Sequence, residues 1–181
     1  MSEPNTPPPP AGAPAGPPRL TLLQQREIEA RIVGPLVRGF LAEFGPDRTL
    51  AVVRSVIEGL ARDSGAQAAA ALADASLDAF AGMLGRWTEG GALEIDLLEQ
   101  TPGRLAFNVT RCRYAEMYRA LGLADLGVHL SCARDFALIE GFNPAVSLER
   151  TQTIMEGAPF CDFRFRAAAP AAGEKDETLP P

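Results

Sequence analysis

Apolar residues recur near the helical period throughout the first half of the chain. From Leu20 onwards glutamate and arginine separate the apolar positions Leu23, Ile28, Ile32, Leu36, Phe40 and Phe44. This pattern predicts an amphipathic helix, which Pro35 should kink or split. We expect a second helix from an N-cap at Asp47 to a break at Ser64-Gly65, and a third, alanine-rich helix over 67–88.

After Gly90-Gly91 the period of the pattern changes to two. The alternation predicts two β-hairpins, separated by a helix over 124–141 that Gly141 closes. The expected strands are 92–99, 104–113, 146–156 and 160–166. The order predicts an α+β fold in which a helical N-terminal half precedes an antiparallel sheet of two hairpins with an intervening helix.

The two ends of the chain differ in composition from the part between them. Residues 1–19 are rich in proline and alanine, and residues 167–181 repeat that character with mixed charge. Such segments offer little apolar surface to pack, so we expect two disordered tails. The folded unit is then a single domain over 20–166.

Charge and cysteine content narrow the function classes. The net charge of -6 disfavours a nucleic-acid binder, because phosphate neutralisation needs a concentrated basic surface. No apolar run approaches the roughly 20 residues of a membrane span. Three cysteines without a secretory signal favour reduced thiols and a cytoplasmic location. We expect a small-molecule substrate as partner, with no nucleic acid and no membrane, and leave a homo-oligomer open.

The cysteines are the strongest indication of chemistry. Cys112, Cys132 and Cys161 all lie in the second half of the chain, each in a different short motif. A thiol is a nucleophile only as thiolate, and neighbouring arginines would lower the thiol pKa in a partly desolvated site. The alternative is that all three are small buried apolar side chains, as free cysteines commonly are.

Two faces of predicted elements bring polar groups to these thiols. On the strand that ends near Cys112, alternation places Asn108, Thr110, Cys112 and Tyr114 on one face. Such a row suits either the wall of a wet cavity or a solvated face. On the helix over 124–141, three-residue spacing puts His129, Cys132 and Asp135 on one face. Cys161 shares its strand face with phenylalanines.

Zinc and an ion pair are alternatives for the same residues. Three thiols and an imidazole form a legitimate zinc set, namely Cys112, His129, Cys132 and Cys161. The spacing contains no Cys-x-x-Cys pair, however, so we expect no metal and no cofactor. Asp135 lies on an apolar-rich helix face, where a carboxylate needs a partner. A salt bridge to a strand arginine and a catalytic role both remain open for it.

Several motifs carry a resemblance to a known family. They are Phe107 to Tyr114, Leu130 to Asp135, Arg150 to Thr153, and Gly157 to Phe163. Together they resemble the L-2-amino-thiazoline-4-carboxylic acid hydrolase family over roughly residues 20–166. The resemblance implies hydrolytic opening of a 2-aminothiazoline ring to N-carbamoyl-L-cysteine. The order of elements is also similar to small ligand-binding domains of the vinyl-reductase type, so a non-catalytic sensor domain stays open.

The chemistry that this activity requires suggests roles for the residues. Either Cys112 attacks the ring carbon between sulfur and nitrogen while Asp135 or His129 handles the proton, or Asp135 activates water and the thiols shape the pocket. An arginine would bind the substrate carboxylate. The candidate catalytic residues are Cys112, Cys132 and Asp135, and the candidate substrate-binding residues are Asn108, Thr110, Arg111, Tyr114, Arg134, Thr151 and Cys161.

Overall fold

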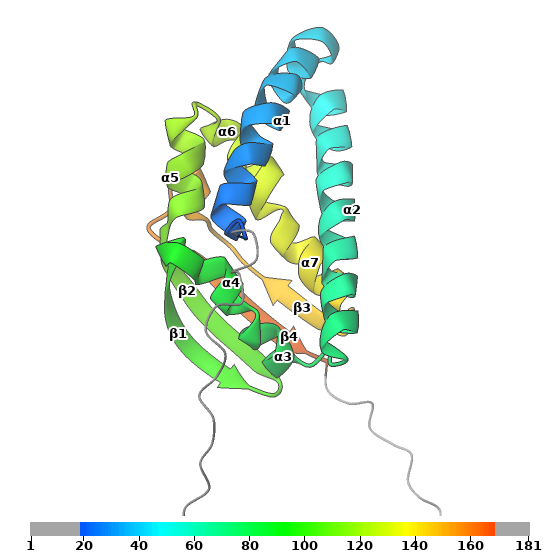
Figure 1. Cartoon of the computed structure of the whole chain (residues 1–181), viewed down its shortest axis with the longest axis vertical. Helices are drawn as coiled ribbons and strands as arrows, with labels where there is room; N and C mark the ends of the chain where they lie inside the picture. The colour runs from blue at the N-terminus through cyan, green and yellow to red at the C-terminus, as the bar shows by residue number, and fades with distance from the viewer. Residues whose placement is uncertain (1–18, 169–181) are drawn as a thin grey trace, which may run out of the picture.

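Residues 19–168 are described by the structure, a computed structural model of the chain (Figure 1). The predicted tails lie outside this range except for Arg19, Ala167 and Ala168. Ala167 is the last residue of a strand, so the ordered sheet extends one residue beyond the predicted domain end.

Two long helices, α1 (Leu22–Phe44) and α2 (Pro46–Leu72), form the N-terminal part of the fold. Helix α1 begins with a capping box, in which Thr21 and Gln24 each accept the other's backbone N–H. Pro35 lies inside α1 without dividing it, which corrects the predicted split. Gly45, with φ +77°, separates the helices and Pro46 is the first residue of α2, so Asp47 is not the N-cap.

Helix α2 runs through the predicted break at Ser64-Gly65. The glycine serves close helix packing: a Cβ at Gly65 would lie 2.1 Å from the carbonyl oxygen of Leu138, in α7 (Arg134–Phe142). Gly141 has the reciprocal role, since its Cβ would lie 2.0 Å from the carbonyl oxygen of Arg62. Gly141 therefore lies within α7 rather than closing it. The predicted third helix is replaced by two short ones, α3 (Leu77–Gly82) and α4 (Leu84–Thr88), followed by the 3-10 turn η1 (Glu89–Gly91).

The sheet has four antiparallel strands in the order β1-β2-β4-β3. They are β1 (Leu93–Thr101), β2 (Arg104–Cys112), β3 (Val146–Glu149) and β4 (Cys161–Ala167). The predicted α+β fold is confirmed. Strand β3 is shorter than predicted, because the backbone N–H groups of Thr151 and Gln152 donate to the Asp162 side chain instead of joining the sheet. A 3-10 turn, η3 (Ile154–Glu156), follows.

The helix predicted over 124–141 consists of three pieces. They are α6 (Ala124–Gly127), a π-helical turn η2 (Val128–Cys132), and α7. The wider π turn changes the angular offset between residues on either side of it. His129 consequently does not share a wall with Cys132 and Asp135 as the three-residue spacing predicted. A further helix, α5 (Arg113–Ala120), connects β2 to this segment.

The buried side chains form two clusters with the Cys112 thiol between them. The first lies on the inner face of the sheet, where Phe107 and Phe163 stack at 4.9 Å under α3 and α7. The second joins α1, α2, α5 and α6 and includes Ala30, Ile57 and Tyr118. Cys112 packs against both clusters. The junction of the two cores is therefore where a cavity forms.

Within residues 19–168, no single helix combines the length and the apolar character needed to cross a bilayer. Only the pair Pro46–Leu72 and Leu77–Gly91, bent by 104°, meets that test by length and composition when its members are taken together.

Candidate functional site

A cavity of about 110 Å³ lies between the two hydrophobic clusters, and we call it the inner cavity. All three thiols line it, although they come from the end of β2, from η2 and from the start of β4. The other polar side chains on its wall are Arg26, Ser64, Tyr114, Ser131, Arg134, Asp135 and Arg150. Six of the ten candidate site residues thus meet here: Cys112, Cys132, Cys161, Asp135, Tyr114 and Arg134.

A β-bulge turns Cys112 toward the inner cavity. Glu94 pairs with Arg111 while the next residue, Ile95, pairs with Val109, so Thr110 is the extra residue on β2. The bulge resets the alternation, and Val109 and Cys112 both line the cavity. The predicted polar row is therefore wrong: strict alternation does not hold across Thr110, which is exposed and does not line the cavity.

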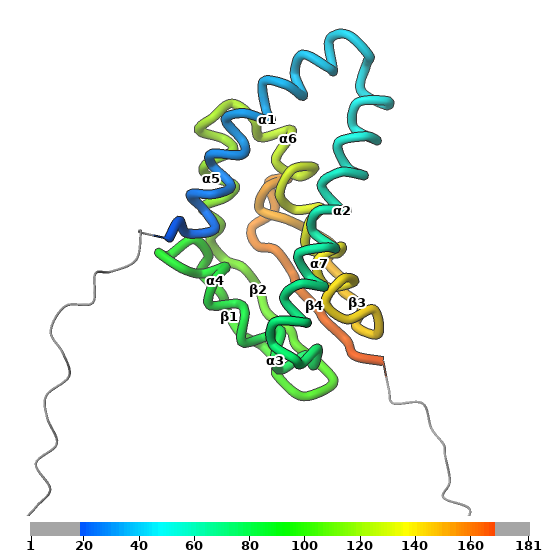
Figure 2. Tube along the Cα trace, turned by 45° about the vertical axis from the view of Figure 1, so that its right-hand side comes forward, coloured from blue at the N-terminus to red at the C-terminus, as the bar shows by residue number. Residues whose placement is uncertain are grey.

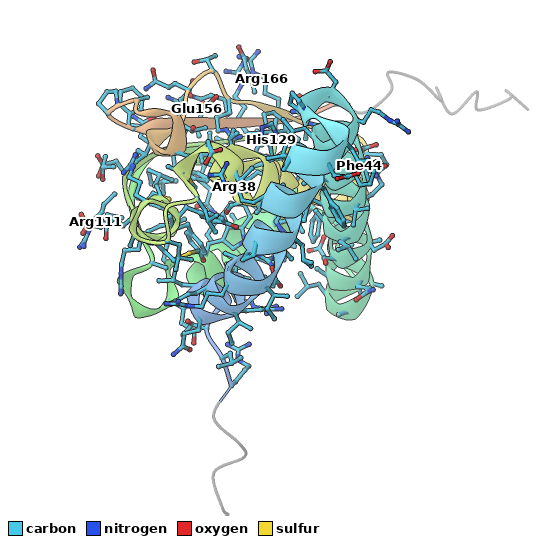
Figure 3. All side chains as sticks on the ribbon, turned by 90° about the horizontal axis from the view of Figure 1, so that it is seen from above. Arg38, Phe44, Arg111, His129, Glu156 and Arg166 are labelled. Carbon is cyan, nitrogen blue, oxygen red and sulfur yellow. The ribbon has the colours of Figure 1, made fainter. Side chains whose placement is uncertain are left out.

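The remaining candidate residues also lie outside the inner cavity. Asn108 accepts a hydrogen bond from Arg164 at 2.8 Å, across from β4. Arg111 is half exposed, pairs with Glu94 and Glu116, and projects at the periphery in Figure 3. The exposed Thr151 donates its hydroxyl to Asp162 at 2.7 Å.

Asp135 and Arg150 form an ion pair on the cavity wall. Arg150 Nη1 donates to Asp135 Oδ2 at 2.5 Å, and Arg150 Nη2 donates to the Cys132 carbonyl at 3.1 Å. The Arg150 side chain is only 6% exposed, with its guanidinium over the rings of Phe136 and Phe163. Burial raises the pKa of the Asp135 carboxyl, although the Arg150 charge acts in the opposite direction.

The sequence analysis did not place Arg150 in the site. Its only signal was membership of the Arg150 to Thr153 motif, because Arg150 follows β3 in an irregular segment whose direction no periodicity fixes. Asp162 holds this segment by accepting from Thr151 and Gln152. Among the described residues, buried Arg150 Nε has no hydrogen-bond acceptor, so a guanidinium edge at the cavity wall is left with an unused donor.

Burial decides the protonation of the three thiols. It raises the pKa of Cys112 to about 11, even though the Ala115 backbone N–H donates to Sγ at 3.4 Å. Burial likewise raises the pKa of Cys132, where the Arg150 charge does not offset it, and the pKa of Cys161. The expectation that arginines lower a thiol pKa here is wrong, because desolvation exceeds the charge effect. All three are thiols at neutral pH.

Two further arginines reach the inner cavity from the helices. Arg134 is 14% exposed and donates to the Leu130 carbonyl at 3.0 Å and to Glu29 at 3.4 Å. Burial lowers the Arg134 pKa, and the nearby Arg26 charge adds to this. Arg26 itself pairs with Glu29 at 2.6 Å. Arg26 could not be predicted from the sequence, because it resembles any solvated position of an amphipathic helix.

The inner cavity adjoins a much larger opening between α1 and α2. This opening, the outer cleft, has a volume of about 1180 Å³. Figure 2 shows the two helices diverging from their junction at Gly45. Arg26, Trp87 and Arg134 line both spaces, as do Leu22, Ser64 and Leu138. The inner cavity and the outer cleft are therefore neighbouring spaces that share part of their walls.

The wall of the inner cavity contains an intrinsic fluorophore. Trp87 is the single tryptophan of the chain, and its backbone carbonyl accepts a hydrogen bond from the Tyr114 hydroxyl at 3.4 Å. Burial raises the pKa of that Tyr114 hydroxyl to about 12, so it is a donor at neutral pH. Ligand entry should thus change the emission of one fluorophore.

The arrangement around the thiols does not resemble a metal centre. Within residues 19–168, no three His, Cys, Asp or Glu side chains are grouped closely enough to hold a metal ion. His129 is half-buried and does not line the inner cavity. Among the described residues, the chemistry that the cavity offers is one carboxylate, three protonated thiols and several guanidinium groups.

Comparisons with known proteins can be set against this geometry. No curated protein matches the chain. The phenol-responsive sensory domain of the transcription activator PoxR, solved with phenol, is 15% identical, with a TM-score of 0.49 over 81% of this chain and 76% of that one. A trafficking protein particle complex subunit 3 from Naegleria fowleri, covalently bound to palmitic acid, is 10% identical, with a TM-score of 0.48 over 80% of this chain and 96% of that one.

A protein family also matches the chain. The L-2-amino-thiazoline-4-carboxylic acid hydrolase family matches residues 25–165, which include every thiol of the inner cavity together with Asp135 and Arg150. Because this match covers most of the chain, from α1 to β4, the protein belongs to the L-2-amino-thiazoline-4-carboxylic acid hydrolase family.

Proposed function

We propose that the inner cavity binds a small cyclic amidine acid, such as L-2-amino-thiazoline-4-carboxylate, and that the chain hydrolyses it. The observation that carries the proposal is the buried Arg150 guanidinium, which holds Asp135 with one edge and leaves Nε without an acceptor. A ligand that bears both an amidine and a carboxylate complements a wall with one carboxylate and several guanidinium groups.

Charge complementarity suggests an orientation for this ligand. The amidine nitrogens would donate to Asp135, and the ligand carboxylate would accept from Arg150 Nε or from the Arg134 and Arg26 side of the cavity. The volume of about 110 Å³ admits one small ring rather than an extended substrate. The family membership supports the same substrate class.

The protonation of the wall favours attack by water over attack by sulfur. Because burial keeps Cys112 and Cys132 protonated, neither thiol is a ready nucleophile. Asp135 would take a proton from water, the hydroxide would add to the ring carbon between sulfur and nitrogen, and the proton of the added hydroxyl group would pass to the ring nitrogen. The carbon–sulfur bond then breaks, the carbon becomes a carbonyl, and Asp135 returns its proton to the departing sulfur. One water is consumed and N-carbamoyl-L-cysteine is released.

The raised pKa of Asp135 suits this exchange of protons. A carboxyl with a pKa above its ordinary value is a stronger base when ionised and a competent acid when protonated at working pH. Arg150 would keep the carboxylate oriented between the two steps. In this scheme the thiols of Cys112, Cys132 and Cys161 shape the cavity and supply weak S–H donors.

A second function, binding without turnover, is favoured by one observation. Asp135 is already paired with Arg150, and burial keeps the Cys112 thiol protonated. A sensor or carrier domain needs no activated nucleophile, only a complementary cavity. Both functions predict ligand-dependent change in Trp87 emission, and only the hydrolase predicts product.

The experiment is incubation of purified protein with L-2-amino-thiazoline-4-carboxylate and detection of N-carbamoyl-L-cysteine by mass spectrometry, with Trp87 fluorescence read in parallel. We expect product from the wild type and from Cys112→Ser, and a loss of at least about 100-fold in kcat for Asp135→Asn. Asp125→Asn is the matched control, because Asp125 is an exposed partner of Arg38. Fluorescence change without product would replace the hydrolase by a binding domain; neither signal would overturn both.

A further inference from the structure

The helices that border the outer cleft leave large apolar side chains exposed. On α1 these residues recur at every fourth position: Ile28, Ile32, Leu36, Phe40 and Phe44. On α2 the same spacing gives Val52, Val56 and Leu60. Ile32 is 62% exposed and Val52 is 64% exposed, although helical periodicity predicts a buried stripe on α1. One chain therefore does not bury its own amphipathic face.

The exposed surface is too long for a small ligand to cover. At about 1.5 Å per residue, α1 and α2 are roughly 35 and 40 Å long, and Phe44 is the last residue of α1. Two helix faces of this length and about 10 Å width would bury roughly 700 Å² per copy, or about 1,400 Å² in total, which is the size of a specific protein interface. Another pair of helices of similar length would match this surface.

We propose that a second copy of this chain covers the outer cleft, with α1 and α2 packed against the same helices of the partner. In such a two-fold interface each residue near the axis meets the same residue of the other copy, so an unpaired charge there would repel its equivalent. Arg31 pairs with Glu27 on α1, and Arg54 pairs with Glu58 on α2. These two ion pairs neutralise like charges beside the apolar stripes within each copy, so the stripes can meet.

The second copy would also complete the binding site. Trp87 and Arg134 line both the outer cleft and the inner cavity, so whatever fills the cleft covers the wall that the two spaces share. A covered wall excludes bulk water, and exclusion of water strengthens electrostatic interactions inside the cavity. The dimer would then be the form in which the arginines hold an anionic ligand most tightly.

Analytical ultracentrifugation of the full chain over a dilution series tests the proposal without substrate, so its outcome is separate from that of the hydrolase assay. We expect twice the mass of one chain at micromolar concentration. Leu36→Glu on α1 and Val56→Glu on α2 should each give a single-chain mass, because each places a charge in the interface. Leu98→Glu is the matched control, since Leu98 is 55% exposed on β1, away from the outer cleft.

Two results would overturn the proposal. One is a single-chain mass for the wild type across the whole series, and the other is a dimer that survives both Leu36→Glu and Val56→Glu. Circular dichroism shows whether a variant has kept its helices; if neither has, the wild-type series decides. Acrylamide quenching of Trp87 should also weaken as the dimer forms, and quenching that is independent of concentration would contradict closure of the site.

Discussion

Asp135 Oδ2 accepts a hydrogen bond from Arg150 Nη1 at 2.5 Å, which joins the first turn of α7 to the segment after β3. Asp135 comes before β3 in the chain and Arg150 comes after it, and both side chains line the inner cavity. Since Arg150 also donates to the Cys132 carbonyl, one guanidinium ties a carboxylate, a thiol-bearing turn and an irregular segment together.

Removal of Arg150 should lower the free energy of unfolding, because the buried Asp135 carboxyl loses its partner. Arg150→Met leaves a buried carboxyl without its partner, and we expect a loss of about 3–5 kcal/mol in the free energy of unfolding, measured in urea at neutral pH. Arg166→Met is the control, because the exposed Arg166 lies 3.8 Å from Glu149 and such pairs contribute at most about 1 kcal/mol. Equal losses of unfolding free energy in the two variants would mean that the buried pair stabilises the fold no more than the exposed pair does.

Substitution of Gly65 should separate steric packing from helix propensity. Gly65→Ala places a methyl group against the α7 backbone, so we expect a loss of about 1–3 kcal/mol or more. Gly59→Ala, in the same helix with no atom within 4 Å of the new Cβ, should be neutral or stabilise by up to about 1 kcal/mol. Thermal unfolding of both proteins checks the difference, and a stabilising Gly65→Ala would refute the close contact.

Stability should fall at alkaline pH because of the three buried thiols, of which Cys112 is one. The pKa of the Cys112 thiol is about 11 in the folded chain and about 9 in the unfolded chain, so the unfolded state loses this proton at a lower pH than the folded state. The contribution is fully present below pH 9 and is lost as pH rises toward 11, by about 1.4 kcal/mol at pH 10. Urea unfolding between pH 8 and 10 measures the slope.

The variant Cys112→Ala assigns this slope. We expect its stability to fall less steeply with pH than that of the wild type, whatever its stability at pH 8. Tyr114 and Tyr118, whose pKa values burial raises to about 12, contribute chiefly above this window. Identical slopes for the two proteins would show that the Cys112 thiol does not resist ionisation.

Asp162 should act as a positioning residue for Arg150. Asp162→Ala removes the acceptor for Thr151 and Gln152 while deleting no side chain that lines the inner cavity. We expect weaker binding of L-2-amino-thiazoline-4-carboxylate in a Trp87 titration, by about tenfold, with the circular dichroism spectrum unchanged. Arg111→Ala, outside the cavity, is the control; equal affinity in Asp162→Ala and wild type would remove the positioning role.

Acid stability provides a second readout of Asp162. Burial acts to raise its pKa, but hydrogen bonds from Thr151 and Gln152 outweigh burial and lower the pKa below the usual value. Stability from this group is therefore present above the ordinary carboxyl pKa and is lost as pH falls through the lowered value. Asp162→Asn should flatten the unfolding free energy between pH 5 and 2, as followed by urea titration.

The fold class followed from sequence because two strong periodicities divide the chain. The helical period up to Trp87 and the alternation after Gly91 are both local properties, and the structure keeps both. The ends of the helices were harder to predict from the sequence. In the sequence Ser64-Gly65 resembles a helix break, whereas in the fold Gly65 lies where α2 packs closely against α7.

The candidate site was predictable only in part, for a related reason. The thiols and Asp135 stand out by residue type, and the structure places them around one cavity. Asn108 and Thr110 were assigned by strict alternation, which the bulge at Thr110 interrupts. Arg150 lies in an irregular segment held by Asp162, and a hydrogen bond from the Gln152 backbone N–H to the Asp162 side chain leaves no periodic trace in the sequence.

The Gly45-Pro46 turn has a consequence for how members of such a family can diverge. Helix α1 meets α2 at this turn and supplies Arg26 to the inner cavity, whereas the thiols, Asp135 and Arg150 all belong to the later part of the chain. A change of one or two residues near Gly45 would alter the spread of the helix arms and leave the reactive groups in register. The width of the outer cleft and the polar groups of the inner cavity can then evolve at separate places in the same gene.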